Sequence, residues 1–101
     1  MRVREGFVES QGHRLAYLAV NERLARADQP SIVFIHGVLA SVRFWLDCVP
    51  PSFKEDRAWY ALSLPAHHPS TVPEDFEREH VDDRWFFDVM NGALRMVRSF
   101  S

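Results

Sequence analysis

The stretch Ser31-Ile32-Val33-Phe34-Ile35-His36-Gly37 decides how this 101-residue chain is expected to fold. Residues 31–35 form a continuous apolar run with β-branched side chains, which is the pattern of a strand covered on both faces within a parallel sheet. Residues 42–49 then place apolar side chains at helical spacing, and we expect Pro50-Pro51 to stop that helix. The order of strand, turn and helix indicates an α/β fold.

The segments on either side extend this pattern into a sheet. Phe7 to Ser10 and Arg14 to Val20 are β-favouring runs around Gly12, which predicts an antiparallel hairpin at a sheet edge. The second run alternates in a way that predicts one face more buried than the other. Residues 59–64 repeat the strand signal up to Pro65, so the chain is expected to complete a βαβ-like unit.

The last part of the chain has the spacing of an amphipathic helix over 82–100. Asp82 and Asp83 lie in its first turn, and Arg95 and Arg98 lie near its last, as the helix dipole favours. We expect its apolar face to pack on the sheet, and we read the aromatic run 85–87 as part of that face rather than as a partner groove. The members of the face are Trp85, Val89, Ala93, Met96 and Phe100, widened by Phe86, Met90 and Val97.

Composition and charge exclude several classes of protein. With 47% hydrophobic and 26% charged residues, the chain is too apolar for disorder and too rich in charge for membrane insertion. A formal net charge of -2 provides no basic patch for nucleic acid. One cysteine and the lack of an apolar leader in the first ten residues predict no intrachain disulfide and a cytoplasmic location. We expect no membrane span, no cofactor and no bound metal.

Taken together, these elements resemble the N-terminal portion of an α/β-hydrolase, and the resemblance covers nearly the whole chain. It rests on the hairpin, the strand ending in His36-Gly37, the helix with Trp45, and the strand that runs into Leu64-Pro65-Ala66-His67. It implies one partial domain over 1–101 with an incomplete, mostly parallel sheet. Its parts would be a hairpin at 1–20, a strand-helix-strand unit at 31–64 and a helix at 82–100.

The resemblance assigns a role to the turn after the apolar strand. In this family a His-Gly-x segment opens the oxyanion-hole loop, and the backbone N–H at the x position, here Val38, points at the developing oxyanion. Gly37 would permit the tight turn and the close approach of the backbone. His36 would support the turn.

A second segment, residues 63–70, resembles the family's stretch of aspartate, leucine, proline or arginine, glycine, any residue, glycine, any residue and serine. Ser63 stands at the aspartate, while Ala66 and His68 stand at the two glycines. Because glycine adopts backbone conformations that other residues rarely adopt, these departures leave the subfamily open.

The family's nucleophile elbow, Gly-x-Ser-x-Gly, does not occur in the sequence. The acid and the catalytic histidine follow it in the family's chain order, so we expect no triad member here. We therefore predict the N-terminal fragment of a serine hydrolase that is inactive alone. Once completed, it would transfer the acyl group of a small-molecule ester or lipid to water. Carbon–halogen, peroxide and amide chemistries also stay open.

Two other interpretations remain open at this point. The chain could be a non-catalytic module that binds a complementary C-terminal half or self-associates through its open edge. It could also be a truncated remnant without function that aggregates.

Several other reactive residues are better explained without chemistry. His67 and His68 lack carboxylate or thiol neighbours at ligand spacing, so we assign them to a loop. Nothing in the spacing sets a base beside Ser41 or Ser70. Cys48 falls on the apolar face of its helix, and we expect it in the core.

Overall fold

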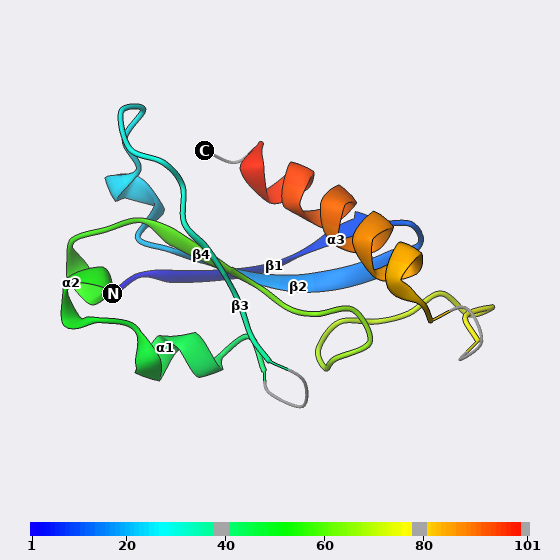
Figure 1. Cartoon of the computed structure of the whole chain (residues 1–101). Coiled ribbons are helices and arrows are strands. Elements are labelled where there is room, and N and C mark those ends of the chain that lie inside the picture. Colours follow the sequence, from blue (N-terminus) through cyan, green and yellow to red (C-terminus); the bar gives the residue numbers. More distant parts are fainter. Residues whose placement is uncertain (38–40, 78–80, 100–101) are drawn as a thin grey trace.

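The computed structural model describes residues 1–37, 41–77 and 81–99 as one sheet with helices on both faces (Figure 1). The strands are β1 (Val3–Ser10), β2 (His13–Val20), β3 (Val33–Ile35) and β4 (Trp59–Leu62). The helices are the 3-10 turn η1 (Glu22–Leu24), α1 (Phe44–Cys48), α2 (Pro51–Glu55) and α3 (Asp83–Arg98).

The four strands have the order β1-β2-β4-β3. β1 and β2 form the expected antiparallel hairpin, in which Ser10 pairs with His13 across the turn. β2 pairs antiparallel with β4, and β3 pairs parallel with β4. The predicted βαβ unit is therefore confirmed, and the chain forms an incomplete α/β sheet of mixed strand direction.

The helices cover opposite faces of this sheet, as the ribbon shows (Figure 1). On one face, α3 packs through Val89, Ala93 and Val97 against β2 and β4. On the other face, α1 and α2 pack against the alternate residues of the same strands. β2 is thus buried on both faces apart from Arg14. The expectation of one mainly buried face was wrong, because helices from two distant segments cover this strand.

β3 lies at the edge of the sheet, which corrects the expectation that it is covered on both faces. Val33 and Phe34 are half-buried, and Ile35 is 40% exposed. In the described part of the chain, β4 is the only strand that pairs with β3. An apolar strand is therefore only partly covered, since an edge strand lacks a neighbour on one side.

The segment after residue 41 departs from the expected single helix. α1 begins at Phe44, and Pro51 starts the separate helix α2 instead of only ending α1. A proline fits the first helical position because its missing N–H would have no partner there. Cys48 is exposed, so its assignment to the core was wrong. Val49 takes the buried position at this turn.

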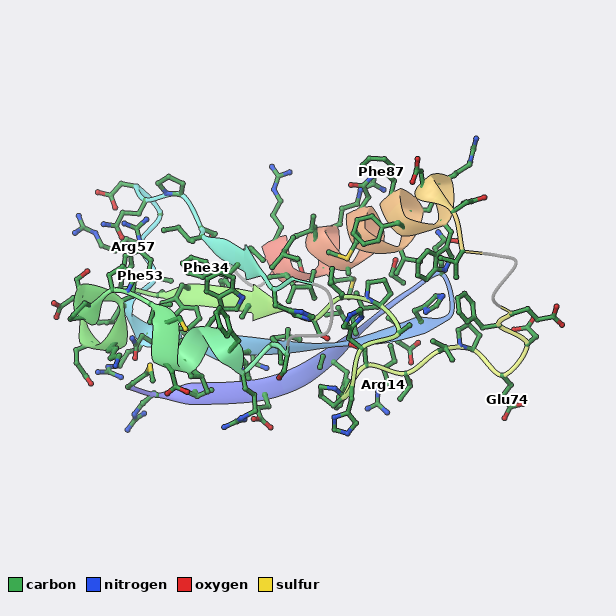
Figure 2. The ribbon with its side chains drawn as sticks, turned by 60° about the horizontal axis from the view of Figure 1, so that its bottom comes forward. Arg14, Phe34, Phe53, Arg57, Glu74 and Phe87 are labelled. Carbon is green, nitrogen blue, oxygen red and sulfur yellow. The ribbon has the colours of Figure 1, made fainter. Side chains whose placement is uncertain are left out.

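α3 matches its sequence pattern at the ends and partly along its face. Asp82 caps the helix by accepting a hydrogen bond from the Trp85 N–H at 2.8 Å. Met96 is 46% exposed, so it does not belong to the packed face, and Phe87 points away from the sheet (Figure 2). Phe100 lies outside the described residues. No helix in the described ranges is long and apolar enough to cross a membrane.

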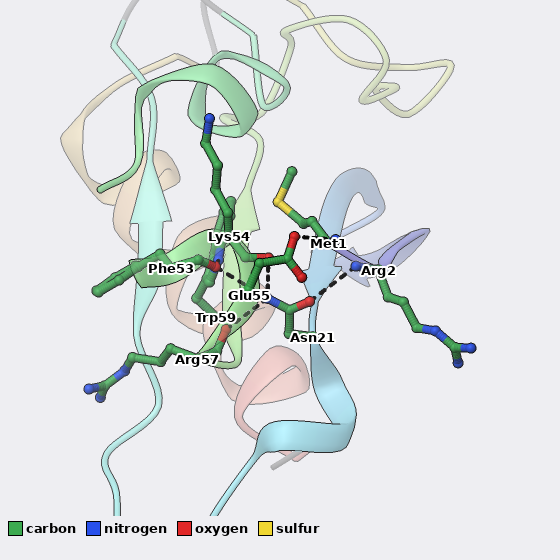
Figure 3. Close-up of polar contacts among 8 residues, drawn as sticks. All are labelled: Met1, Arg2, Asn21, Phe53, Lys54, Glu55, Arg57 and Trp59. Atoms are coloured by element: carbon green, nitrogen blue, oxygen red, sulfur yellow. Dashed lines mark hydrogen bonds and ion pairs between the residues drawn. The ribbon is translucent and has the colours of Figure 1, made fainter. Parts of the chain in front are cut away.

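A buried asparagine joins the hairpin to α2 (Figure 3). Asn21 is 1% exposed and has a left-handed backbone, with φ at 53°. Its Nδ2 donates to the carbonyls of Phe53, Lys54 and Arg57 at 3.0 to 3.2 Å. Its Oδ1 accepts from the Arg2 N–H at 3.1 Å. One side chain thus satisfies backbone groups at both ends of the connection.

Candidate functional site

His36 lies at the carboxyl end of β3 and links it to the end of β4. The imidazole is 3% exposed. The Leu64 N–H donates to Nε2 at 3.0 Å, so this nitrogen carries a lone pair. In the neutral ring the proton is then on Nδ1, which donates to the Gly37 carbonyl at 2.7 Å. The side chain therefore fixes both the neighbouring strand and the carbonyl of the next residue.

The described residues leave space for a side chain at Gly37. Among residues 1–37, 41–77 and 81–99, a Cβ built at this position meets no atom within 4 Å, and its φ lies outside the left-handed range. Val38, the expected oxyanion donor, lies outside the described residues, so its role stays a prediction.

The loop after β4 lies beside His36. The ring of His67 makes an edge contact with the ring of His36, with centroids 5.3 Å apart. Nδ1 of His67 is 3.1 Å from the Pro65 carbonyl oxygen. The buried Ser63 hydroxyl donates towards the carbonyl oxygens of Leu64 at 3.2 Å and His67 at 3.4 Å. This loop therefore holds its own shape while it covers the imidazole of His36.

The loop after β4 has a left-handed residue at one of the two positions where the family has glycine. Ala66 stands where the family has its first glycine, and its φ is 63°, in the left-handed region. The backbone thus has the conformation that favours glycine, although the residue is alanine. His68, at the second glycine position, is exposed.

The serines near this site have structural roles in the described chain. The Ser70 hydroxyl accepts from the Ala16 N–H at 3.0 Å, and the Ser41 hydroxyl accepts from the Arg43 N–H at 3.1 Å. Among residues 1–37, 41–77 and 81–99, neither hydroxyl is hydrogen-bonded to an imidazole. In the same ranges no three His, Cys, Asp or Glu side chains converge as metal ligands would.

Sequence reasoning found His36 but missed its two partners. Leu64 and His67 are 28 and 31 positions away along the chain, and the contact arises because β3 and β4 are parallel neighbours. The available signal was the position of each residue just after a predicted parallel strand, since such ends meet at one edge of a sheet.

Comparison with known proteins adds the wider architecture. The structure is similar to the Cif epoxide hydrolase from Acinetobacter nosocomialis, with a TM-score of 0.67 and 23% identity over 94% of this chain and 27% of that one. It is similar to a membrane phospholipase A described as a bacterial virulence factor, with a TM-score of 0.65 and 23% identity over 91% of this chain and 28% of that one. It is also similar to Epoxide Hydrolase A from Mycobacterium thermoresistibile, with a TM-score of 0.63 and 21% identity over 95% of this chain and 28% of that one.

The chain spans about a quarter of the length of the solved structures that it matches, with 27% of the first and 28% of the other two. No protein-family model and no curated protein sequence matches it.

Proposed function

The chain has the fold of the N-terminal portion of an α/β-hydrolase, and from this premise we propose that it is the oxyanion-loop part of a serine hydrolase. The observation that carries the proposal is the link that His36 makes between Leu64 and Gly37. The reaction is transfer of an acyl group from an ester or lipid to water.

The direction of the Gly37 carbonyl determines the direction of the N–H that follows it. In a planar trans peptide, the C=O and the following N–H point in opposite directions. A side chain that holds the Gly37 carbonyl therefore also sets the direction of the N–H that follows it. In this proposal that N–H belongs to Val38 and is one of the two donors that stabilise the oxyanion. His36 then acts as a positioning residue and Gly37 as the residue that leaves room for the substrate.

The faces that the helices cover indicate where the next strand would lie. The connection from β3 to β4 passes through α1 and α2 on one face, whereas α3 follows β4 on the opposite face. Parallel crossovers are right-handed, so a change of face reverses the direction of advance. A parallel strand after α3 would therefore pair with the free edge of β3. A nucleophile on the turn that ends it would stand beside His36 and Gly37.

In the completed site a serine attacks the ester carbonyl, and a histidine accepts its proton and returns it to the alcohol that leaves. Water then hydrolyses the acyl-enzyme and restores the serine. The N–H of Val38 and that of the residue after the serine bind the oxyanion. Because this chain contributes one donor and no nucleophile, we expect it to be inactive alone. The similarity to a phospholipase supports an acyl substrate.

The test uses the chain extended through its downstream coding sequence, with p-nitrophenyl butyrate as substrate. We expect turnover by the extended protein and none by the 101-residue chain. His36→Ala should lower kcat at least about tenfold with little change in KM, because a misplaced oxyanion donor costs about 10²–10³ in kcat. His68→Ala, at an exposed position of the neighbouring loop, is the matched control. Unchanged kcat in His36→Ala would contradict the proposal.

A second candidate function is binding of a complementary chain. The free edge of β3 favours it, because Ile35 is 40% exposed and a groove of about 490 Å³ beside it is lined by Val33, Leu94 and Val97. A C-terminal half that supplies a parallel strand would cover both features. Size-exclusion chromatography of the 101-residue chain with and without that half tests this, and the two peaks staying separate would contradict it.

A further inference from the structure

His13 joins three segments that are far apart in the sequence. It is the first residue of β2, directly after the hairpin turn, and its side chain is 2% exposed. The Trp85 Nε1–H donates to its Nε2 at 2.9 Å. Its ring also makes edge contacts with the rings of Phe76 and Trp85, at centroid distances of 4.8 and 5.3 Å. One imidazole thus contacts the loop before α3 and the first turn of α3.

The neutral imidazole of His13 carries its hydrogen on the nitrogen that has no hydrogen-bond partner among the described residues. Since Nε2 accepts the hydrogen bond from Trp85, the neutral ring carries its hydrogen on Nδ1. That nitrogen is buried and has no hydrogen-bond partner among the described residues. A second proton would go to Nε2, where it would replace the hydrogen bond with two N–H groups that face each other. Protonation would also bury a charge.

The charged groups on the surrounding elements do not offset such a charge. They are Glu9 and Arg14 of the hairpin, Glu74, Asp75 and Glu77 of the loop, and Asp82, Asp83 and Arg84 at the start of α3. All are exposed, and none is hydrogen-bonded to the His13 ring. Asp82 instead caps α3, the Arg14 guanidinium lies over the Phe7 ring, and Glu74 projects from the loop (Figure 2). Burial alone lowers the pKa of His13.

From this arrangement we infer that His13 is an acid-sensitive latch, which holds the loop around Phe76 and the first turn of α3 against the hairpin while it is neutral. Opening is local because other contacts hold the segment at both ends. Thr71 forms two backbone hydrogen bonds with Arg14, at 2.8 and 2.9 Å. Further along α3, Val89 and Ala93 are fully buried against the sheet. Between these points, the His13 contacts fasten the helix start.

The test is amide hydrogen exchange on the full 101-residue chain between pH 7.5 and 5, corrected for intrinsic exchange. An opening linked to one proton becomes up to tenfold more populated for each pH unit below about 6.5, the ordinary pKa of histidine. We expect this rise at Phe86 and neighbouring amides of the first turn of α3. The β4 amides should show no such rise.

Two variants separate the latch from general acid sensitivity. His13→Gln retains a side-chain oxygen that can accept the hydrogen bond from Trp85 but cannot be protonated between pH 7.5 and 5. In this variant the corrected exchange of the first-turn amides of α3 should therefore not depend on pH. His68→Gln removes an exposed histidine from the preceding loop and should behave as the wild type. An equal rise in His13→Gln, or a rise that includes β4, would overturn the inference.

A direct titration covers the case in which His13→Gln does not fold. The NMR resonance of the His13 ring Cε1–H in the wild-type chain reports its protonation. A midpoint below about 6.5, the ordinary pKa of histidine, is expected for His13. A midpoint at or above that value would overturn the inference without any variant.

Discussion

Replacement of Asn21 should cost a large part of the stability of the chain. Asn21→Ala removes the donor to three backbone carbonyls and the acceptor for the Arg2 N–H. The amide nitrogen has two hydrogens, so two of its three contacts share one hydrogen. Two donated bonds and one accepted bond, at about 1 kcal/mol net for each, and up to about 1 kcal/mol for placing alanine in a left-handed conformation, give a loss in unfolding free energy of about 3 to 4 kcal/mol. The Phe53 carbonyl keeps the hydrogen bond from Trp59 Nε1 at 2.8 Å, which favours the lower end of this range of stability loss. A domain of this size has only about 5–15 kcal/mol in total.

Asn21→Asp keeps the shape of the side chain and changes its chemistry. One carboxylate oxygen would replace the amide nitrogen and face the three carbonyl oxygens, so at pH 7 this variant should be less stable than Asn21→Ala. Burial among acceptors raises the pKa of the new carboxyl group in the folded state. Its penalty is therefore greatest at neutral pH and falls as the pH drops through that raised pKa.

Urea denaturation followed by circular dichroism measures both effects, at pH 7 and pH 4.5. Asn91→Ala and Asn91→Asp are matched controls on the exposed side of α3 and should change stability by less than about 0.5 kcal/mol. A loss of less than about 1 kcal/mol in unfolding free energy for Asn21→Ala would refute this role of Asn21. An Asn21→Asp variant as stable as Asn21→Ala at pH 7, or more stable, would refute it as well.

Three further predictions concern backbone contact, strain and exposure. Gly92→Ala should destabilise the folded chain by about 1–3 kcal/mol, since the new Cβ would lie 3.1 Å from Cβ of Ser10 and still closer to the Ser10 hydroxyl. A higher melting temperature, as the better helix propensity of alanine alone would give, would contradict this. Ala66→Gly should stabilise by about 0.5–1 kcal/mol because φ is 63°, and a lower melting temperature would disprove it. The Cys48 thiol should react with Ellman's reagent in the folded chain at nearly its unfolded rate, whereas protection until unfolding would restore the core assignment.

The elements that sequence reasoning predicted are those with local periodicity. The hairpin and α3 have patterns complete within 20 residues, and the βαβ unit follows from two apolar runs around a helix. The strand order does not, because inserting β4 between β2 and β3 involves pairing across more than 20 residues. The edge position of β3 and the double cover of β2 both result from that order.

Sequence reasoning assigned Cys48 wrongly and gave no indication of the burial of Asn21 or of the partner of His13, because other segments decide their environments. Cys48 has helical spacing with Trp45, but α1 is too short to bury it. Asn21 stands in a polar connector and is nevertheless buried, because its amide groups match three carbonyls of the α2 region. The contact between His13 and Trp85 joins residues 72 positions apart, so no periodicity could have indicated it.

The placement of β4 also determines the order in which this chain can assemble during synthesis. β3 leaves the ribosome well before β4, yet both β2 and β3 pair with β4 and not with each other. At about 5–20 residues per second, the apolar run 33–35 spends seconds without its sheet partner. Nascent chains stalled where β3 has emerged from the ribosome and β4 has not should therefore bind chaperones through this run. Chains stalled where β4 has also emerged should release them.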